Sequence, residues 1–441
     1  MQVARAIELH VRDATAILLA LSGGRDSVVL LDVLRPLCNA RGIALSAAHV
    51  HHGLSPHAEE WASFCAALCT RHCVPLHLLR VDVGRGASTS IEAAARDARY
   101  RALAGLASTL GVQAVLLAQH ADDQAETVLL QLARGAGPRG ISAMPAARRA
   151  ADGVAWLRPL LDVPRAAIDA HAAANALEYV DDDSNTSARF RRNALRQMVV
   201  PALRAIAPGY PHTLVRAAAL AAEASLLADE LAALDARDAF DGQSLARAPL
   251  AELAPHRARN LLRWYLRANG CRAPSAARLA QMLAQLAHAS PDAQVELLHD
   301  GTVIGVYAGR VRVHAPPPPA FDCVWHGEPA LVLAHGTLDF LAQRGAGLRA
   351  GMVGDARWSV RARSGGERLT LDRARPRRML KALLQEAGLP AWERDVLPLL
   401  FCGDALAAVP GIGVDVAFRA EACGILVSWR AHPQNRATKT R

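Results

Sequence analysis

Two short polar clusters in the first third of the chain carry residue types that could transfer a nucleotide. The first cluster, residues 22–27, reads Ser-Gly-Gly-Arg-Asp-Ser and follows the apolar run 16–21. Its two glycines allow a tight turn that a ligand can approach closely, and the apolar residues from Val28 onward predict a helix. Because a strand, a glycine-rich turn and a helix N-terminus together present backbone N–H groups, this junction is expected to hold phosphate.

The second cluster, residues 119–123, reads Gln-His-Ala-Asp-Asp and follows the apolar run 112–118. Displacement of pyrophosphate from ATP needs donors for the leaving group and carboxylates for a divalent cation. Mg²⁺ takes one or two carboxylates besides substrate phosphates, which predicts Asp26 and Asp123 as its ligands. The predicted catalytic residues are Asp26, His120, Asp122 and Asp123. The predicted ATP-binding residues are Ser22, Gly23, Gly24, Arg25, Asp26 and Ser27.

Strands and helices alternate through the first half of the chain. Apolar patterns predict strands at 16–21, 43–50, 76–83 and 112–118, with helices at 59–73, 91–106 and 122–132 between and after them. Thr89 and Glu92 form a capping box at the start of the second of these helices. Such alternation predicts a parallel, Rossmann-like α/β sheet with helices on both faces. Ligands of these sheets bind beyond the carboxyl ends of the strands, so both polar clusters should meet in one crevice.

The second half of the chain has a different composition. Residues 211–289 are rich in Ala and Leu at helical spacing, a short β-like patch covers 295–313, and four prolines at 316–319 form a stiff spacer. Short strands and one helix at 378–387 follow. We therefore expect an α/β domain at 1–210, a mainly helical domain at 211–315, a small α+β domain at 321–430 and a disordered tail at 431–441.

The chain is basic, with a net charge of +9 and a pI near 9.5. A basic protein favours an anionic partner such as nucleic acid, although the general excess of Arg and Ala weakens this argument. The sequence lacks an 18-residue uncharged apolar stretch and a signal-peptide pattern, so a cytoplasmic protein is expected. Cys65, Cys69 and Cys73 could line one helix face around a metal, but small apolar residues in a packed helix are the preferred interpretation.

Two other glycine-rich segments do not fit a nucleotide site. Residues 135–140 match GxGxxG but follow a predicted helix rather than a strand. Residues 364–367 repeat Ser-Gly-Gly without the preceding strand and without the Asp-Ser ending. We interpret the second segment as a loop and exclude the first as a dinucleotide site.

The first cluster resembles the SGGxDS loop of PP-loop ATP pyrophosphatases, which cleave ATP between its α- and β-phosphates. Further motifs run in the order found in tRNA(Ile)-lysidine synthases, and the chain is similar to that family over nearly its whole length. These motifs lie at residues 51–55, 92–100, 120–127, 134–140, 158–161, 183–185, 192–196, 388–394 and 409–413.

The resemblance implies a ligase that uses ATP and Mg²⁺ and acts on the isoleucine tRNA whose anticodon is CAU. ATP would adenylate carbon 2 of the wobble cytidine and release pyrophosphate. The ε-amine of free lysine would then displace AMP to give lysidine, which changes the specificity from methionine to isoleucine. The amine must lose a proton before it attacks; His120 or a carboxylate could accept it. A homodimer is compatible with the sequence.

Two groups of basic residues are candidate contacts for the tRNA. Arg192 and Arg196 belong to an arginine cluster that could bind ATP phosphate or the anticodon loop, the alternative being a solvated helix face. The second group lies in the Arg-rich stretch 361–381, where contacts to the RNA backbone would make binding salt-dependent. Its members that we assign to the tRNA are Arg375, Arg377, Arg378 and Lys381.

Three other functions compete with this interpretation. A PP-loop tRNA thiolase would need cysteine chemistry or a cluster, and the eight cysteines contain no CxxC pair. A PP-loop amidotransferase or ligase for a small metabolite fits less well with a basic chain that has additional domains. A non-catalytic RNA-binding module would not need Asp26, Asp122 and Asp123.

Overall fold

The computed structural model describes residues 14–83, 91–150, 153–181, 191–288, 295–345, 347–349 and 357–432. The chain divides into two compact units, one up to Leu227 and the other from Ala228 onward, and each is described by itself. Among the described residues, no helix has the length and apolar character needed to cross a membrane. The predicted capping residue Thr89, the motif 183–185 and the tail beyond residue 432 lie outside the described residues.

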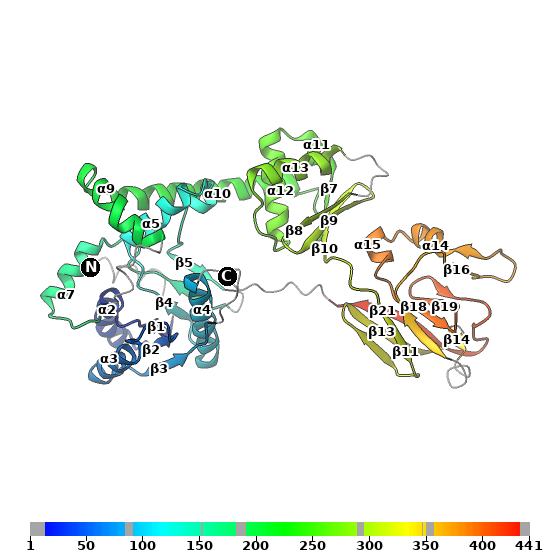
Figure 1. The fold of residues 1–441 in the computed structure, drawn as a ribbon, viewed down its shortest axis with the longest axis horizontal. Helices are drawn as coiled ribbons and strands as arrows, with labels where there is room; N and C mark the ends of the chain where they lie inside the picture. The colour runs from blue at the N-terminus through cyan, green and yellow to red at the C-terminus, as the bar shows by residue number, and fades with distance from the viewer. Residues whose placement is uncertain are drawn as a thin grey trace. The chain divides into compact units, whose positions relative to one another are not determined.

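A six-stranded sheet forms the centre of the first unit, with the strand order β3-β2-β1-β4-β6-β5 (Figure 1). Strands β1, β2, β3, β4 and β6 are parallel to one another, which confirms the predicted Rossmann-like sheet. The edge strand β5 pairs antiparallel with β6, which the sequence did not predict. The strands are β1 (Ala16–Ala20), β2 (Ala44–His51), β3 (Leu76–Arg80), β4 (Ala114–Leu116), β5 (Ala147–Arg149) and β6 (Ala155–Leu157).

Helices cover both faces of this sheet. One apolar core joins strand residues such as Ile17 and Leu19 to helices α2, α3 and α7. A second core on the other face joins Leu18 and Val115 to Leu103 of α4. These helices are α2 (Arg25–Arg41), α3 (Ala58–Arg71), α4 (Ile91–Leu110) and α7 (Arg165–Ala174). Cys65 and Cys69 are buried in the first core, as expected for small apolar residues in a packed helix. For Cys73 this expectation was wrong, because α3 ends at Arg71 and the Cys73 side chain is exposed.

A group of helices follows the sheet and packs against α5 (Ala121–Leu132). The short α6 (Pro138–Ile141) comes directly after α5 in the chain. A π-helical turn at Leu195–Val199 lies between α8 (Arg191–Ala194) and α9 (Val200–Ile206), and α10 (Tyr210–Ala236) comes next. Val200 and Tyr210 are buried against Ala125 of α5. The packing brings this helical group beside the second polar cluster.

The second unit begins with helices that pack on an antiparallel sheet. The core of this part includes Leu261, Leu279 and Ile304, and its sheet has the order β7-β10-β9-β8. The β patch predicted at 295–313 is confirmed, whereas β7 was not predicted. The elements are β7 (Ser244–Ala246), α11 (Ala248–Glu252), α12 (Pro255–Ala268), α13 (Ala276–His288), β8 (Glu296–His299), β9 (Thr302–Tyr307) and β10 (Arg310–His314).

Two antiparallel sheets and two short helices follow after the prolines. The sheet orders are β11-β15-β18-β19-β20 and β12-β13-β21-β14, and the pair β16-β17 stands apart. Trp325, Phe340 and Trp358 pack in the core of this part. The strands are β11 (Asp322–Trp325), β12 (Ala330–Leu333), β13 (Gly336–Arg344), β14 (Leu348–Arg349), β15 (Trp358–Arg361), β16 (Arg368–Leu369), β17 (Arg378–Met379), β18 (Leu399–Cys402), β19 (Ala405–Val409), β20 (Gly413–Val414) and β21 (Cys423–Ala431). The helices are α14 (Leu380–Glu386) and α15 (Ala391–Arg394), and α14 confirms the helix expected at 378–387.

Helix α15 carries the motif at residues 388–394 and contacts strands β9 and β10. Trp392 stacks on His314 with ring centroids 4.6 Å apart, and a Cβ at Gly305 would come within 2.6 Å of the Trp392 ring. Arg394 is 7 % exposed and donates to the hydroxyl of Tyr307 at 3.3 Å. The motif therefore joins the two halves of the second unit.

Candidate active site

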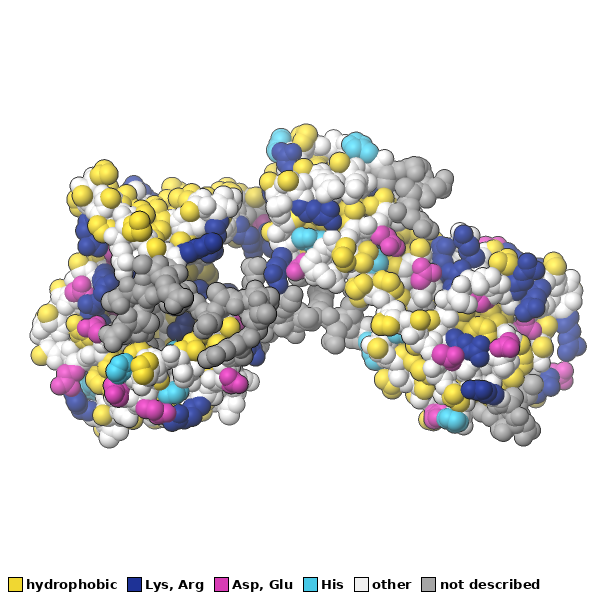
Figure 2. Space-filling model, viewed as in Figure 1, with side chains coloured by type: hydrophobic (Ala, Val, Ile, Leu, Met, Phe, Trp, Pro, Cys, Tyr) yellow, Lys and Arg dark blue, Asp and Glu magenta, His cyan; other side chains and the backbone are white. Residues whose placement is uncertain are grey.

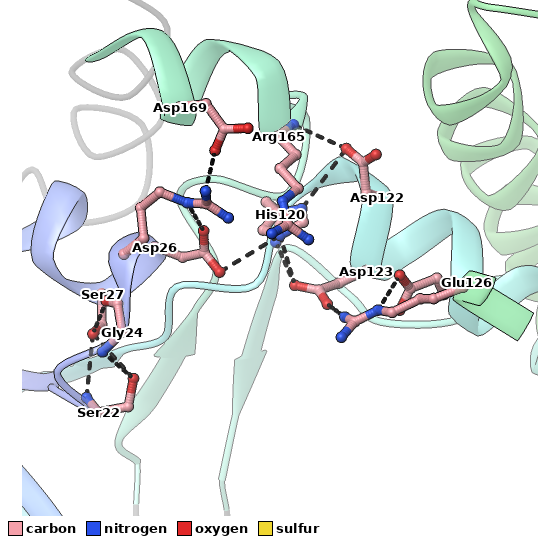
Figure 3. A network of polar contacts seen from close by, with 12 residues as sticks. Ser22, Gly24, Asp26, Ser27, His120, Asp122, Asp123, Glu126, Arg165 and Asp169 are labelled. Carbon is pink, nitrogen blue, oxygen red and sulfur yellow. Dashed lines mark hydrogen bonds and ion pairs between the residues drawn. The ribbon is translucent and has the colours of Figure 1, made fainter. Parts of the chain in front are cut away.

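The predicted phosphate-binding loop connects β1 to α2. Gly24 is extended and caps α2, and Gly23 has a φ of 86°, a conformation that favours glycine. The hydroxyl of Ser27 donates to the carbonyl of Gly24 at 2.8 Å and lies 3.1 Å from the hydroxyl of Ser22. Both serines therefore fix the turn (Figure 3). The N–H of Ser27 already donates to the carbonyl of Gly24 at 3.0 Å. The N–H groups of Arg25 and Asp26, at the first two positions of α2, have no acceptor within the helix and are suited to phosphate.

The loop is closely packed from the side of α3 and from residue 180. A Cβ on Gly23 would come within 2.9 Å of the Val180 side chain and 3.1 Å of the Cys65 sulfur. The N–H of Val180 donates to the carbonyl of Gly23 at 3.0 Å. Any larger residue at position 23 would push the turn out of place, so the glycine is needed for space as well as for its backbone conformation.

Asp26 and the second polar cluster converge, as the sequence predicted (Figure 3). His120 lies between the two acids: its Nε2 atom is 3.6 Å from Oδ2 of Asp26 and 3.5 Å from Oδ2 of Asp123. The imidazole is buried, and His120 follows β4 and caps α5. The backbone N–H of His120 donates to Oδ2 of Asp123 at 3.2 Å. The carboxyl ends of β1 and β4, which pair in parallel, thus form one site.

The two carboxylates differ in their electrostatic environment. Burial raises the pKa of Asp26 above its ordinary value, and the negative charge of Asp123 adds to this effect, while His120 opposes it. Burial would also raise the pKa of Asp123, but His120, Arg192 and Arg196 together lower it. Asp123 is therefore a stable anion, whereas Asp26 is a carboxylate that would gain from a bound cation.

The residues present fit one divalent cation held jointly by protein and phosphate. The Oδ1 atom of Asp26 is buried and has no hydrogen-bond partner among the described residues, which is unfavourable unless a ligand satisfies it. Among the described residues, no group of three or more His, Cys, Asp or Glu side chains forms a metal cage. Mg²⁺ does not require one, because substrate phosphates and water complete its octahedral shell. Asp26 and Asp123 are suited to this role.

Arg192 and Arg196 lie beside the acids rather than on a separate surface. The Nε atom of Arg192 donates to Glu126 at 2.8 Å and that of Arg196 to the same carboxylate at 2.5 Å. Arg196 also donates to Asp123 at 3.1 Å. The Glu126 carboxylate is 5 % exposed, so two guanidinium groups neutralise an otherwise costly buried charge.

Arg25, at the variable position of the loop, points toward α7. Its guanidinium lies 2.8 Å from Asp169 and 5.6 Å from the centre of the Tyr179 ring. Its Nε atom also lies 3.8 Å from Oδ1 of Asp26, so the side chain links the loop to α7 at the edge of the site.

A pocket of about 430 Å³ opens next to Asp122. Asp122 accepts hydrogen bonds from the N–H of Arg165 at 2.9 Å and from the hydroxyl of Tyr210 at 3.4 Å. The pocket combines carboxylates, guanidinium groups and apolar side chains. Its lining residues are Asp122, Glu126, Arg165, Arg196, Val200, Pro201, Arg204, Ala205 and Tyr210.

Three residues at this pocket were not predicted from the sequence: Arg165, Arg204 and Tyr210. They lie on α7, α9 and α10, far along the chain from the strand ends that carry the recognisable clusters. The spacing of Arg196, Val200 and Arg204, four residues apart, is the one signal that could have placed them on a common helix face.

The other predicted basic group lies on the β16–β17 pair and α14. Figure 2 shows Lys and Arg side chains gathered over this part of the second unit. Arg375, Arg377 and Lys381 are exposed, whereas Arg378 pairs with Glu386. Arg363, from the same stretch, is held by Asp395 and Glu367. The exposed members are the ones available to an anionic partner.

The two excluded glycine-rich segments have other structures. Residues 138–141 form α6 after the end of α5, so residues 135–140 do not follow a strand. At 364–367, the carboxylate of Glu367 accepts the N–H groups of Ser364 and Gly365 at 2.6 and 2.7 Å. The second segment is thus a turn closed by its own acid, which confirms it as a loop.

Comparison with known families gives three matches along the chain. A PP-loop domain matches residues 1–203, a TilS substrate binding domain matches 245–312, and a TilS substrate C-terminal domain matches 358–429. A tRNA(Ile)-lysidine synthase from Nitrosomonas europaea is 39 % identical and aligns over 97 % of this chain and 94 % of its own length. The enzymes of the same name from Burkholderia pseudomallei and Azoarcus sp. are 40 and 42 % identical, covering 92 % of this chain and 90 and 89 % of their own.

Proposed function

The chain belongs to the tRNA(Ile)-lysidine synthase family of ATP-using PP-loop ligases, and from this premise we propose how its residues divide the reaction. The enzyme joins lysine to carbon 2 of the wobble cytidine of the isoleucine tRNA with a CAU anticodon. One observation carries the assignment of roles: His120 bridges Asp26 of the phosphate-binding loop and Asp123 of the second cluster. We therefore place both steps of the reaction at the junction of these residues.

The first step is adenylation of the base. The N–H groups of the loop at residues 22–27 bind the pyrophosphate that leaves, and the hydroxyls of Ser22 and Ser27 keep the turn in shape. Asp26 and Asp123 would hold Mg²⁺, which would neutralise the charge that develops on the phosphates. The oxygen of carbon 2 attacks the α-phosphate in line, and the P–O bond to the pyrophosphate breaks. An unpaired anticodon base can be turned out of its stack to reach this point.

The second step is attack by lysine, and we assign the pocket beside Asp122 to this substrate. Lysine has a cation at each amine, an anion at its carboxylate and an aliphatic stem between them. The pocket offers the carboxylates of Glu126 and Asp122 for the amines. It offers Arg204 for the carboxylate and Val200 for the aliphatic stem. Because Asp122 lies 3.9 Å from His120, we orient the ε-amine toward Asp122 and the α-carboxylate toward Arg204. The ε-amine then displaces AMP as the C–O bond to the phosphate breaks.

His120 is our candidate for the group that takes the proton from the ε-amine. The imidazole is buried between the ATP side and the lysine side of the site. Within the described parts of the chain its Nδ1 atom has no hydrogen-bond partner. This atom lies 3.9 Å from Oδ2 of Asp122, so a proton accepted there can be stabilised by that carboxylate. A general base must lie close to the proton that it accepts, and His120 lies next to the side chain toward which we orient the ε-amine.

The lysine assignment is tested with the variant Arg204→Gln and with the diamine cadaverine, which lacks the carboxylate. We expect the KM for lysine to rise by about 10- to 100-fold, the scale of a hydrogen bond to a charged group, and the KM for ATP to stay unchanged. The variant should also lose the preference for lysine over cadaverine. If the variant keeps the wild-type preference for lysine over cadaverine, the carboxylate of lysine does not bind at Arg204.

The remaining parts of the chain are assigned to the tRNA. We propose that the catalytic domain spans 1–210, that the helical part at 211–315 and the C-terminal part at 321–430 bind the tRNA, and that Arg192, Arg196, Arg375, Arg377, Arg378 and Lys381 contribute. Arg192 and Arg196 would act from the wall of the active site. The enzyme is expected to work in the cytoplasm, where its tRNA is, and a homodimer is compatible with this function.

The overall function is tested by measuring AMP and pyrophosphate release from ATP. Release that needs both the isoleucine tRNA transcript and free lysine supports the proposal. A transcript in which the wobble cytidine is replaced by uridine serves as the matched control and should give background release. Turnover that ignores lysine would contradict the proposal and favour another PP-loop reaction.

A further inference from the structure

His49 is a buried titratable residue that the reaction described above does not use. It lies on β2, the neighbour of β1, one residue beyond the register pair that joins Ala20 to Ala48. The side chain is 5 % exposed. Its Nδ1 atom lies 2.9 Å from the carbonyl oxygen of Leu21, the residue directly before the phosphate-binding loop.

The direction of this hydrogen bond is fixed by chemistry. A carbonyl oxygen only accepts, so the Nδ1 atom must carry a proton and donate it. Burial lowers the pKa of His49 below its ordinary value, while the bond to Leu21 opposes this effect. The ring is therefore neutral with its proton on Nδ1, and it offers one fixed donor to the strand that ends in the loop.

Leu21 is held on both of its backbone groups. Its N–H donates to the carbonyl of Ala48 at 2.9 Å, and its carbonyl accepts from His49. The Sγ atom of Cys65 lies 3.4 Å from the same Nδ1 atom of His49. This sulfur also lies next to the loop, because a Cβ placed on Gly23 would be 3.1 Å from it. His49 and Cys65 thus pack together against the backbone at Leu21 and Gly23.

We propose that His49 is a positioning residue for ATP, which acts by fixing the carbonyl of Leu21 and thereby the N–H groups of the loop. This inference rests on the proposed function, because it needs the loop at residues 22–27 to bind the pyrophosphate. A donor displaced by about 1 Å can cost 10²-fold in rate.

Three variants of the full-length protein separate the donor from the bulk of the ring. His49→Asn keeps an N–H at the position of Nδ1, since both atoms are bonded to the γ-carbon. His49→Gln moves its N–H one bond outward, and His49→Leu has no donor. Leu103→Val, in the core on the opposite face of the sheet, is the control for lost stability.

We expect His49→Leu and His49→Gln to reduce kcat/KM for ATP in pyrophosphate release by about 10- to 100-fold, while the KM for lysine and the affinity for tRNA are unchanged. His49→Asn should restore most of this loss. Leu103→Val should lower the melting temperature without this effect. The comparison of Asn with Gln remains informative even if the Leu variant does not fold.

Two results would overturn the inference: a folded His49→Gln with the wild-type kcat/KM for ATP, or a His49→Asn that is as impaired as His49→Gln. ATP binding by calorimetry, without tRNA or lysine, is measured in parallel. If the wild type binds ATP but forms no lysidine, the proposed function fails, and the binding data still decide the role of His49.

Discussion

The Nε2 atom of His120 lies 3.6 Å from the Oδ2 atom of Asp26. This contact joins the end of β4 to the first turn of α2, and it makes a single site of two clusters that are far apart in the sequence. The same nitrogen lies 3.5 Å from Oδ2 of Asp123, so both carboxylates that we propose as Mg²⁺ ligands face one imidazole.

Asp26→Asn is expected to abolish adenylation. The amide keeps the size of the side chain but cannot neutralise Mg²⁺, so pyrophosphate release should fall by about 100- to 1000-fold, the scale of losing one electrostatic contact in the transition state. tRNA affinity should stay within a factor of about two, since the electrostatic contacts that dominate RNA affinity are made elsewhere. Asp32→Asn, on the same helix but paired with His171 at 2.8 Å, is the matched control and should keep its activity.

Arg192→Gln is expected to change the pH dependence of the enzyme. Arg192 helps to lower the pKa of Asp123 against the effect of burial, so its removal raises that pKa. The acid limb of kcat/KM for ATP should therefore shift to higher pH. Arg191→Gln, at the exposed neighbouring position, should leave the profile unchanged, and an unshifted limb in Arg192→Gln would argue against the coupling.

The same variant should lose stability in a pH-dependent way. A carboxyl whose pKa is depressed in the folded state contributes stability above its unfolded pKa, near 3.8 for aspartate, and loses it as the pH falls through the folded value. Loss of the bonds from Arg192 to Glu126 and to the carbonyl of Asp123 should cost about 2 kcal/mol at neutral pH. Denaturant unfolding should show this difference shrinking below pH 3.8.

The sequence predicted the parts of this site that follow strands. The loop at residues 22–27 and the cluster at 119–123 were predictable because strand–helix alternation requires parallel strands, whose carboxyl ends meet. The antiparallel strand β5 could not be predicted, since three residues, Ala147–Arg149, are too short for a periodic pattern. Arg204 and Tyr210 were missed because only helix packing on α5 brings them to Asp122.

The arginines show a further limit of sequence reasoning. Arg192 and Arg378 look alike in the sequence, as members of basic runs. In the structure, Arg192 neutralises the buried Glu126 and Arg378 pairs with Glu386. Whether a guanidinium is available to RNA depends on which acid lies opposite it, and a single sequence does not give that information.

The combined replacement of Arg375, Arg377 and Lys381 by Gln is expected to weaken tRNA binding and its salt dependence together. Each lost phosphate contact should reduce the slope of log K against log salt by roughly 0.7 to 0.9, so three contacts give about 2 to 3. Arg361→Gln is the matched control, because Arg361 lies over the Phe401 ring and beside Asp322. A slope that stays at the wild-type value would show that these residues do not contact the tRNA phosphates.

The central claim is that ATP activates the base and not the lysine. The most direct measurement follows the α-phosphate of ATP, labelled with ³²P, in a reaction with enzyme and tRNA but without lysine. We predict that the label appears on the tRNA with release of pyrophosphate, and that added lysine chases it off as AMP. Label that appears only after lysine is added, and then on the amino acid instead of the tRNA, would contradict the account.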